Sequence, residues 1–308
     1  MKKETVFMTM DDGKQIALHK WIPEGKINII MQISHGMAEY ALRYDRFANF
    51  LGSFGIAVYA HDHRGHGQTA KNDDELGFIA KKNGFNRVVE DLHFMIRKCK
   101  TDFPDAKCIL FGHSFGSFVT QAFIERYGSE LDGCILCGTA GPNLAVAKVG
   151  KTLAAIISFF KGVHYRSKFL DTLSFGVYNK KIRGVKTNFD WLSRDKTEVK
   201  KYIDSKYCGF LCTASFFYDI TYGLCVIHTK KAMTCIPHNL PVFFIDGTCD
   251  PVGNYTKSVL KLIKIYKHIG VKNITYKFYP EARHELLNEI NRDEVMGDIL
   301  KWTKGLLP

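Results

Sequence analysis

A serine between two glycines is the residue whose surroundings most directly suggest chemistry. The segment Gly112-His113-Ser114-Phe115-Gly116 follows an apolar run and precedes a helical pattern. A sharp turn from a strand into a helix lifts a serine hydroxyl clear of the sheet, and the glycines let neighbouring backbone approach it. The pattern predicts Ser114 as a nucleophile, with capping of the following helix as the structural alternative. His113 stands beside it, where it can either line a pocket or pack.

Two later residues have the types that such a serine requires. A serine hydroxyl becomes a good nucleophile when a base takes its proton and a carboxylate orients that base. In one known order of these triads the serine comes first, the acid second and the histidine last. Asp250 and His284 each follow a predicted strand, at the end where ligands gather in parallel sheets. They are the predicted acid and base, and Asp246, nearer the end of its strand, is the alternative acid.

Backbone N–H groups must also stabilise the negative oxygen of a tetrahedral intermediate. One donor is expected to be the N–H of Phe115, directly after the nucleophile. The second is expected in the loop after the third strand, which reads His35-Gly36-Met37, with Met37 N–H as the donor. A simple turn is the alternative for this loop.

Short apolar runs alternate with helical patterns over most of the chain. Helical spacing of apolar residues predicts helices from Tyr44 to Phe54 and from Val89 to Cys99, and over 115–127, 256–268 and 292–304. The predicted strands are Val6–Met10, Gln15–Trp21, Asn28–Ser34, Ile56–Ala60, Cys108–Phe111, Cys134–Cys137, Val242–Ile245 and Ile274–Tyr279. This alternation predicts an α/β fold with about eight strands in a mostly parallel sheet.

The alternation breaks between residues 141 and 232. This stretch has 16 basic and 6 acidic residues and so carries +10 of the chain's net charge of +12. Its apolar residues, including Leu153–Phe160, are expected to line an acyl channel or to form a small core. Positive charge beside apolar residues predicts contact with an anionic membrane surface, with a solvated lysine-rich face as the alternative. No nucleic-acid-binding module is recognisable, so nucleic acid is not an expected partner.

The cysteines and the apolar runs indicate in which cellular compartment the protein is expected. The nine cysteines are odd in number and scattered, unlike a secreted disulfide framework. Cys134 and Cys137 have the spacing of a metal or redox pair, but they lie in an apolar run that predicts a buried strand. No run approaches the roughly 20 apolar residues of a membrane span, and no secretory signal is readable. We expect a cytoplasmic protein that is able to associate with a membrane.

Two longer segments resemble a known family. His35-Gly36-Met37-Ala38-Glu39-Tyr40-Ala41-Leu42-Arg43-Tyr44 resembles the H-G-x-x-E-H-x-x-R-Y segment of monoacylglycerol lipases and bacterial lysophospholipase-like hydrolases. Asp62-His63-Arg64-Gly65-His66-Gly67-Gln68-Thr69 is similar to their D-x-R-G-H-G-x-S loop. The resemblance implies the α/β-hydrolase fold, with a core of residues 1–140 and 233–308 and a helical cap, residues 141–232, inserted after strand six. It also implies the Ser114–His284–Asp250 triad, and neither a metal nor an organic cofactor.

The resemblance further places Glu39 and Arg43 near a glycerol pocket, with an ion pair that only braces the loop as the alternative. Two positions depart from the family. Tyr40 replaces the second histidine of the first motif, and Leu287 replaces a histidine that mammalian lipases carry three residues after the base. These departures bear on specificity for glycerol esters rather than on ester hydrolysis.

The sequence therefore predicts a serine hydrolase of carboxylic esters, acting on monoacylglycerols, lysophospholipids or similar small acyl esters. A dehalogenase or epoxide hydrolase on this fold would need an aspartate in place of Ser114. A peptidase of the proline iminopeptidase kind is one alternative, and it should need an acidic pocket for the substrate amine. A non-catalytic lipid-binding homologue is the other, against which the intact triad argues.

Overall fold

The computed structural model describes residues 1–307, and its centre is one eight-stranded sheet. The strands are β1 (Lys2–Thr9), β2 (Gln15–Ile22), β3 (Ile29–Ser34), β4 (Ile56–His61), β5 (Lys107–His113), β6 (Gly133–Cys137), β7 (Val242–Gly247) and β8 (Ile274–Tyr279). They lie in the order β1-β2-β4-β3-β5-β6-β7-β8. The pairs β1–β2 and β2–β4 are antiparallel and the others are parallel. The predicted α/β fold with mostly parallel strands is confirmed.

The central strands are buried on both faces, as expected for a parallel sheet between two layers of helices. Every residue of β3, β4, β6 and β7 is buried, whereas β1 at the edge alternates between exposed and half-buried positions. The predicted start of β1 at Val6 is wrong. The strand begins at Lys2 because all of Lys2–Thr9 pairs in register with Gln15–Ile22.

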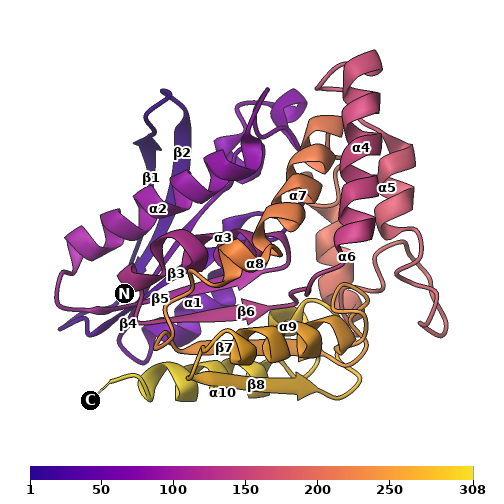
Figure 1. Ribbon diagram of the computed structural model, residues 1–308. Coiled ribbons are helices and arrows are strands. Elements are labelled where there is room, and N and C mark those ends of the chain that lie inside the picture. The colour runs from indigo at the N-terminus through magenta and orange to yellow at the C-terminus, as the bar shows by residue number, and fades with distance from the viewer. Residues whose placement is uncertain (308) are drawn as a thin grey trace.

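Helices cover both faces of the sheet, each over its own hydrophobic core (Figure 1). One core is shared by α2 (Gly84–Asp102), α3 (Phe115–Tyr127) and α9 (Lys257–His268), and the other by α1 (Asp45–Gly52) and α10 (Arg292–Lys304). Cys134 faces the first core and Cys137 the second, so the predicted buried strand is confirmed and the two thiols point apart. Short 3₁₀ helices occupy Ala41–Tyr44 (η1), Gly67–Thr69, Asp73–Glu75, Gly128–Glu130 and Leu286–Asn288.

Five helices lie between β6 and β7, where the sequence showed only irregular helical patches. They are α4 (Leu144–Lys161), α5 (Lys168–Phe175), α6 (Lys196–Asp204), α7 (Ala214–Ile227) and α8 (Lys230–Met233). α7 packs against α2 and α3, and α4 packs on α7, farther from the sheet (Figure 1). Because Phe216 and Ile227 of α7 belong to the same core as α2 and α3, this segment is anchored to the sheet layer.

Helix α4 exposes much of its apolar surface. Ala154 is buried and Leu153 and Ile157 pack against the core, but Phe159 and Phe160 are 82% and 75% exposed. The expectation that the whole run Leu153–Phe160 lines a channel or forms a small core is therefore wrong at its end. No helix among residues 1–307 combines the length and the apolar character that crossing a bilayer requires.

Candidate active site

Ser114 occupies the turn between β5 and α3 with a left-handed backbone, φ +52° and ψ −120°. Its N–H donates to Cys137 O at 3.0 Å, which ties the turn to the neighbouring strand. A Cβ at Gly116 would lie 2.5 Å from the carbonyl oxygen of His35, and one at Gly112 would lie 2.6 Å from that of Gly116. Both positions therefore favour glycine, because a side chain would have to displace the backbone oxygens that fill this space. The strained serine is held where its hydroxyl can meet a substrate.

His284 lies on the loop after β8, with Nδ1 2.7 Å from Oδ2 of Asp250, which follows β7. Burial raises the pKa of Asp250, but the adjacent His284 outweighs it and holds that pKa below the ordinary value. The other carboxylate oxygen of Asp250 accepts the N–H of Val252 at 2.8 Å. Burial beside Asp250 instead raises the pKa of Asp246 well above its ordinary value. Asp250 is thus the ionised partner of His284, and Asp246 is a neutral acid behind it.

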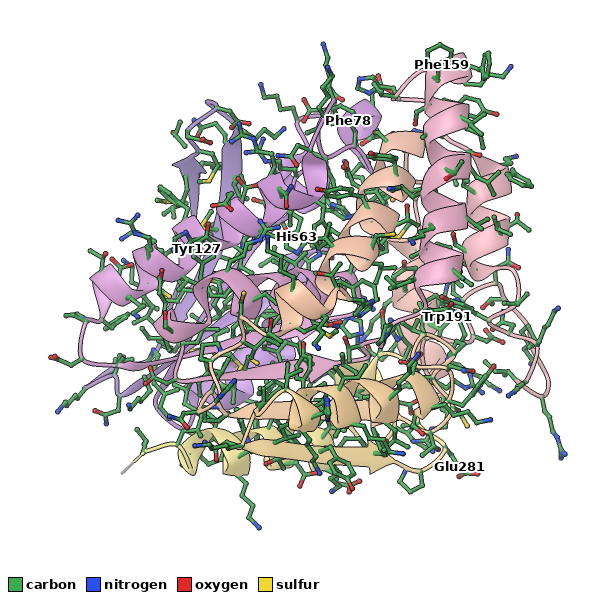
Figure 2. All side chains as sticks on the ribbon, viewed as in Figure 1. His63, Phe78, Tyr127, Phe159, Trp191 and Glu281 are labelled. Atoms are coloured by element: carbon green, nitrogen blue, oxygen red, sulfur yellow. The ribbon has the colours of Figure 1, made fainter. Side chains whose placement is uncertain are left out.

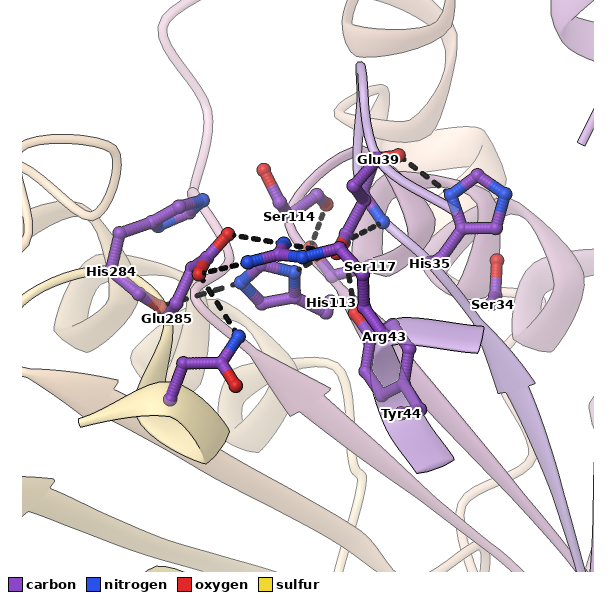
Figure 3. A network of polar contacts seen from close by, with 12 residues as sticks. Ser34, His35, Glu39, Arg43, Tyr44, His113, Ser114, Ser117, His284 and Glu285 are labelled. Atoms are coloured by element: carbon purple, nitrogen blue, oxygen red, sulfur yellow. Dashed lines mark hydrogen bonds and ion pairs between the residues drawn. The ribbon is translucent and has the colours of Figure 1, made fainter. Parts of the chain in front are cut away.

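The end of β6 brings the serine and histidine loops together. Ser114 is bonded to Cys137, and a Cβ at the next residue, Gly138, would lie 3.0 Å from the His284 ring. The ring of His113 lies 4.8 Å from that of His284, centroid to centroid. Figure 3 shows His113 in the middle of a polar network, with Ser114 and His284 close to it. Because β5, β6 and β8 are parallel, their carboxyl ends deliver these groups to one place.

The loop after β3 supplies the second side of the site. Gly36 lies against Ser114, since a Cβ on it would be 3.2 Å from the serine Cβ. Next to it, Met37 N–H has no backbone acceptor among residues 1–307, and neither has Phe115 N–H at the start of α3. Ala38 has φ +50°, which turns the chain sharply after these donors. Two amides without acceptors beside a serine are the arrangement that an oxyanion site requires.

Buried histidines hold this loop in shape. His35 Nε2 accepts the N–H of His63 at 2.9 Å, so its Nδ1–H is free to donate to Gly36 O at 2.8 Å. His66 Nε2 accepts the N–H of Ala38 at 3.2 Å. Burial lowers the pKa of His66 to about 3, so it stays neutral and keeps an acceptor nitrogen. The motif around His63 and His66 thus fixes the loop that carries Met37.

The segment between β6 and β7 also braces the site. The hydroxyl of Tyr202 and the N–H of Gly209 both donate to Ala38 O, each at 2.9 Å. Trp191 O accepts the N–H of His284 at 3.4 Å, and the two rings lie 5.0 Å apart. Figure 2 shows Trp191 on the inner side of this segment, toward the sheet. The inserted segment therefore contacts both the loop after β3 and the loop that carries His284.

Four charged side chains form a buried network beside Ser114 and His284 (Figure 3). Arg43 donates to Glu39 Oε2 at 2.7 Å and to both carboxylate oxygens of Glu285 at 2.6 and 2.8 Å. Glu39 Oε1 accepts the hydroxyl of Tyr44 at 2.9 Å and lies 3.0 Å from His113 Nδ1. The cavity beside the network measures about 20 Å³. That is room for about one water molecule.

The network shifts the protonation of its own members. Burial raises the pKa of Glu39, but the hydrogen bond from His113 and the charge of Arg43 outweigh it and hold that pKa well below its ordinary value. Burial lowers the pKa of His113, but the hydrogen bond and charge of Glu39 more than reverse this. The pair is therefore an ion pair next to Ser114.

All the residues predicted for the site lie around this one place: Met37, Glu39, Arg43, His113, Ser114, Phe115, Asp250 and His284. Reasoning from the sequence missed Glu285, and it counted Trp191 among the apolar residues able to line an acyl channel without placing it against His284. Glu285 directly follows the predicted base, which was a usable signal, but its partner Arg43 is 242 residues away. Nothing in the local sequence around Trp191 indicates that it packs on His284.

Comparisons with known proteins agree with this geometry. The chain is 27% identical over 299 residues to the monoglyceride lipase of Homo sapiens, covering 91% of this chain and 86% of that protein. It is 26% identical over 292 residues to a monoacylglycerol lipase of Mycolicibacterium smegmatis, covering 94% and 93%. The crystal structure of a thermostable carboxyl esterase from Bacillus coagulans, in complex with glycerol, matches with a TM-score of 0.90, 27% identity and 99% of both chains.

These similarities confirm the resemblance to monoacylglycerol lipases and the α/β-hydrolase fold. The family described as serine aminopeptidase S33, Hydrolase_4, matches residues 25–291, which is most of the chain. The match spans the serine turn, both loops that carry Asp250 and His284, and the inserted helices. The chain therefore belongs to this family of hydrolases.

Proposed function

We propose that this protein is a serine hydrolase that cleaves carboxylic esters with Ser114, His284 and Asp250. The observation that carries the proposal is the strained turn at Ser114 beside a buried histidine whose Nδ1 lies 2.7 Å from a carboxylate. A histidine oriented in this way presents its other ring nitrogen to a nucleophile and tolerates the proton that it takes. The similarity to monoglyceride lipases and a carboxyl esterase supports an ester as the substrate.

The reaction follows from the arrangement of these groups. Ser114 Oγ attacks the ester carbonyl while His284 Nε2 takes the hydroxyl proton, and Asp250 accepts Nδ1–H and stabilises the imidazolium. The negative oxygen accepts hydrogen bonds from the N–H groups of Met37 and Phe115. In this class of site each such donor contributes a factor of roughly 10²–10³ to the rate. His284 then protonates the leaving alcohol. Water next attacks the acyl-enzyme with His284 as base, which releases the acid and restores the serine.

The substrate class is proposed from the relatives and from the inserted segment. Monoacylglycerols are the first candidates, with lysophospholipids or similar small acyl esters as the second. Residues 141–232 act as the cap, because their helices cover the end of the sheet where the triad lies and contact both of its loops. The apolar side chains of Phe175, Tyr178 and Trp191 lie against one another beside His284. They offer an acyl chain an apolar surface next to the nucleophile.

An aminopeptidase, the activity in the family's description, is the competing function. It would need a carboxylate free to bind the substrate's ammonium group. The two carboxylates of the buried network, Glu39 and Glu285, have all four oxygens within hydrogen-bond distance of Arg43, Tyr44 or His113. This arrangement favours an ester over a peptide with a free amine.

Hydrolysis of a p-nitrophenyl ester series from acetate to palmitate, by the wild type and Ser114→Ala, tests the proposal. We expect turnover that Ser114→Ala abolishes, and a preferred chain length that sizes the acyl site. Monoacylglycerol, lysophosphatidylcholine and prolyl p-nitroanilide are then compared at equal concentration. Turnover of the anilide alone would establish the peptidase. No turnover of any substrate by folded wild type would support the non-catalytic lipid-binding homologue.

We further propose that helix α4 docks this enzyme on anionic membranes. Phe159 and Phe160 stand at the far end of α4 with Lys161 directly after them (Figure 2). Lys148 and Lys151 lie along the same helix, whose sequence contains no acidic residue. An apolar tip inserts into the interface while lysines attract anionic headgroups, each worth about 1 kcal/mol near the surface. Such docking would bring the cap to the lipid in which an acyl ester resides.

Sedimentation with phosphatidylcholine vesicles, with and without phosphatidylserine, tests the docking. We expect binding only to the anionic vesicles and weaker binding at high salt, because the attraction is screened. The double variant Phe159→Ser, Phe160→Ser should bind less while it hydrolyses p-nitrophenyl acetate normally. Phe94→Ser, which changes an exposed phenylalanine on α2, is the matched control. Equal binding by both variants would refute a role for the tip of α4.

A further inference from the structure

The buried network beside the triad joins two loops that must keep a fixed separation. Glu39 belongs to the loop after β3, and its Oε1 accepts the N–H of Gly36, the residue before Met37, at 2.5 Å. Glu285 belongs to the loop after β8 and directly follows His284. Arg43 holds both carboxylates, with distances of 2.6 to 2.8 Å. One loop carries an oxyanion donor and the other carries the base, so this bridge connects the two halves of the reaction site.

The charges of the network balance only if His113 is a cation. Glu39, Glu285 and Arg43 are 3%, 5% and about 10% exposed, so their charges have little access to water. Two carboxylates and one guanidinium leave a net charge of −1, which is costly in a buried site. His113, itself buried, lies against Glu39 and can supply the missing positive charge.

The two ring nitrogens of His113 support the same conclusion. Nδ1 lies 3.0 Å from a carboxylate oxygen of Glu39, and Nε2 lies 3.4 Å from the carbonyl oxygen of His284. Both neighbours are acceptors only. A neutral imidazole has one N–H and can donate to one of them, whereas an imidazolium donates to both. The geometry on both sides of the ring therefore fits the charged form.

We infer that His113 and Glu285 are positioning residues, which together with Glu39 and Arg43 form a four-charge bridge that sets the oxyanion loop against the His284 loop. The inference rests on the proposed serine hydrolase function. It differs from the role that the family resemblance implies for Glu39 and Arg43, because both side chains are engaged with protein groups. The bridge acts on the rate of the chemical step rather than on the binding of substrate.

The charge of His113 makes the inference testable by pH. Glu39 raises the pKa of His113 against the effect of burial, and Glu285 adds to the increase. The imidazolium is therefore present below this raised pKa and is lost as pH rises through it. The ionisable groups facing the ring are Glu39 and His35 from the loop after β3, Arg43 and Tyr44 from η1, Cys137 at the end of β6, and His284 and Glu285 after β8. Of these, the two glutamates stabilise its charge.

The decisive experiment measures kcat and KM across pH for the wild type, Glu285→Gln and His113→Asn. We expect Glu285→Gln to lower kcat about tenfold with KM within about threefold, since a misplaced group costs rate rather than affinity. In the wild type we expect kcat to decline as pH rises through the pKa of His113. In Glu285→Gln this decline should lie at lower pH, because His113 has lost one of the two anions that stabilise its charge. His113→Asn keeps a donor toward Glu39, so we expect it to retain more kcat than His113→Leu and to lack that decline. Glu294→Gln, in an exposed ion pair with Lys277, is the matched control.

Two results would overturn the inference. A raised KM with unchanged kcat in both variants would make Glu285 and His113 substrate contacts. An alkaline limb that is the same in His113→Asn as in the wild type would show that His113 is neutral. ¹⁵N NMR of the histidine rings gives a readout independent of turnover: we expect one ring with both nitrogens protonated at neutral pH, absent in His113→Asn. If the wild type hydrolyses no ester, the proposed function fails, while the NMR result still decides the charge of His113.

Discussion

Gly116 controls the distance between the nucleophile's helix and the oxyanion loop, and Gly116→Ala should therefore slow the reaction without unfolding the protein. A Cβ at this position would lie 2.5 Å from the carbonyl oxygen of His35 and closer still to that of Ser34. Carbon and carbonyl oxygen normally approach to roughly 3.3 Å. The loop after β3 must therefore retreat by about 1 Å, and Met37 moves with it because it is two residues further along the same loop.

A displacement of this size has a calculable consequence for the rate. A misplacement of about 1 Å in a reaction site can cost roughly 10²-fold, or about 2.7 kcal/mol of transition-state stabilisation. We expect kcat for p-nitrophenyl butyrate to fall by about that factor, with KM little changed, because the moved donor acts mainly on the oxyanion. Overpacking should also lower the free energy of unfolding by about 1–3 kcal/mol.

Gly297→Ala provides the matched control, because a Cβ on this glycine of α10 meets nothing within 4 Å. Alanine in a helix interior stabilises by up to about 1 kcal/mol relative to glycine, so this variant should melt slightly higher and keep full activity. Thermal unfolding followed by circular dichroism establishes that both variants are folded before kinetics are compared. Wild-type kcat in folded Gly116→Ala would refute the reasoning, because it would show that the position of this loop does not limit the rate.

Two further predictions concern the buried acid and the buried histidines. Asp250→Asn should lower kcat by about 10⁴-fold with little change in melting temperature, because the amide stabilises the wrong tautomer of His284. A loss below tenfold would show that another carboxylate orients His284. Burial lowers the pKa values of His61 and His66 to about 3. The unfolded chain takes up protons at these side chains below about pH 6.5, while the folded state does not until about pH 3, so stability should decrease as pH falls through this window. Melting temperatures recorded from pH 7 to pH 4 check this, and a constant value would contradict it.

Local rules predicted from the sequence the strand, turn and helix around Ser114, and the structure has all three. The serine turn needs only an apolar strand, a helix pattern and two glycines, all of which are contiguous along the chain. The carboxyl ends of parallel strands meet at one edge of the sheet, so residues that follow such strands can be assigned to one site without knowing any distance. For the same reason the sequence alone could assign Met37, Phe115, Asp250 and His284 to one edge of the sheet, where the structure has them.

Three features were decided by tertiary structure alone. The sequence places Asp246 and Asp250 four residues apart, and both are fully buried, so only the orientation of the side chains shows that His284 contacts Asp250. The partner of Glu285 lies 242 residues away, and no local pattern encodes a contact that depends on how two loops converge. The helices between β6 and β7 have apolar residues on several sides, so periodicity could not distinguish the buried face of α4 from the exposed end at Phe159. Sequence determines these side chains and their local backbone, whereas burial and charge pairing depend on neighbours that only the folded chain brings together.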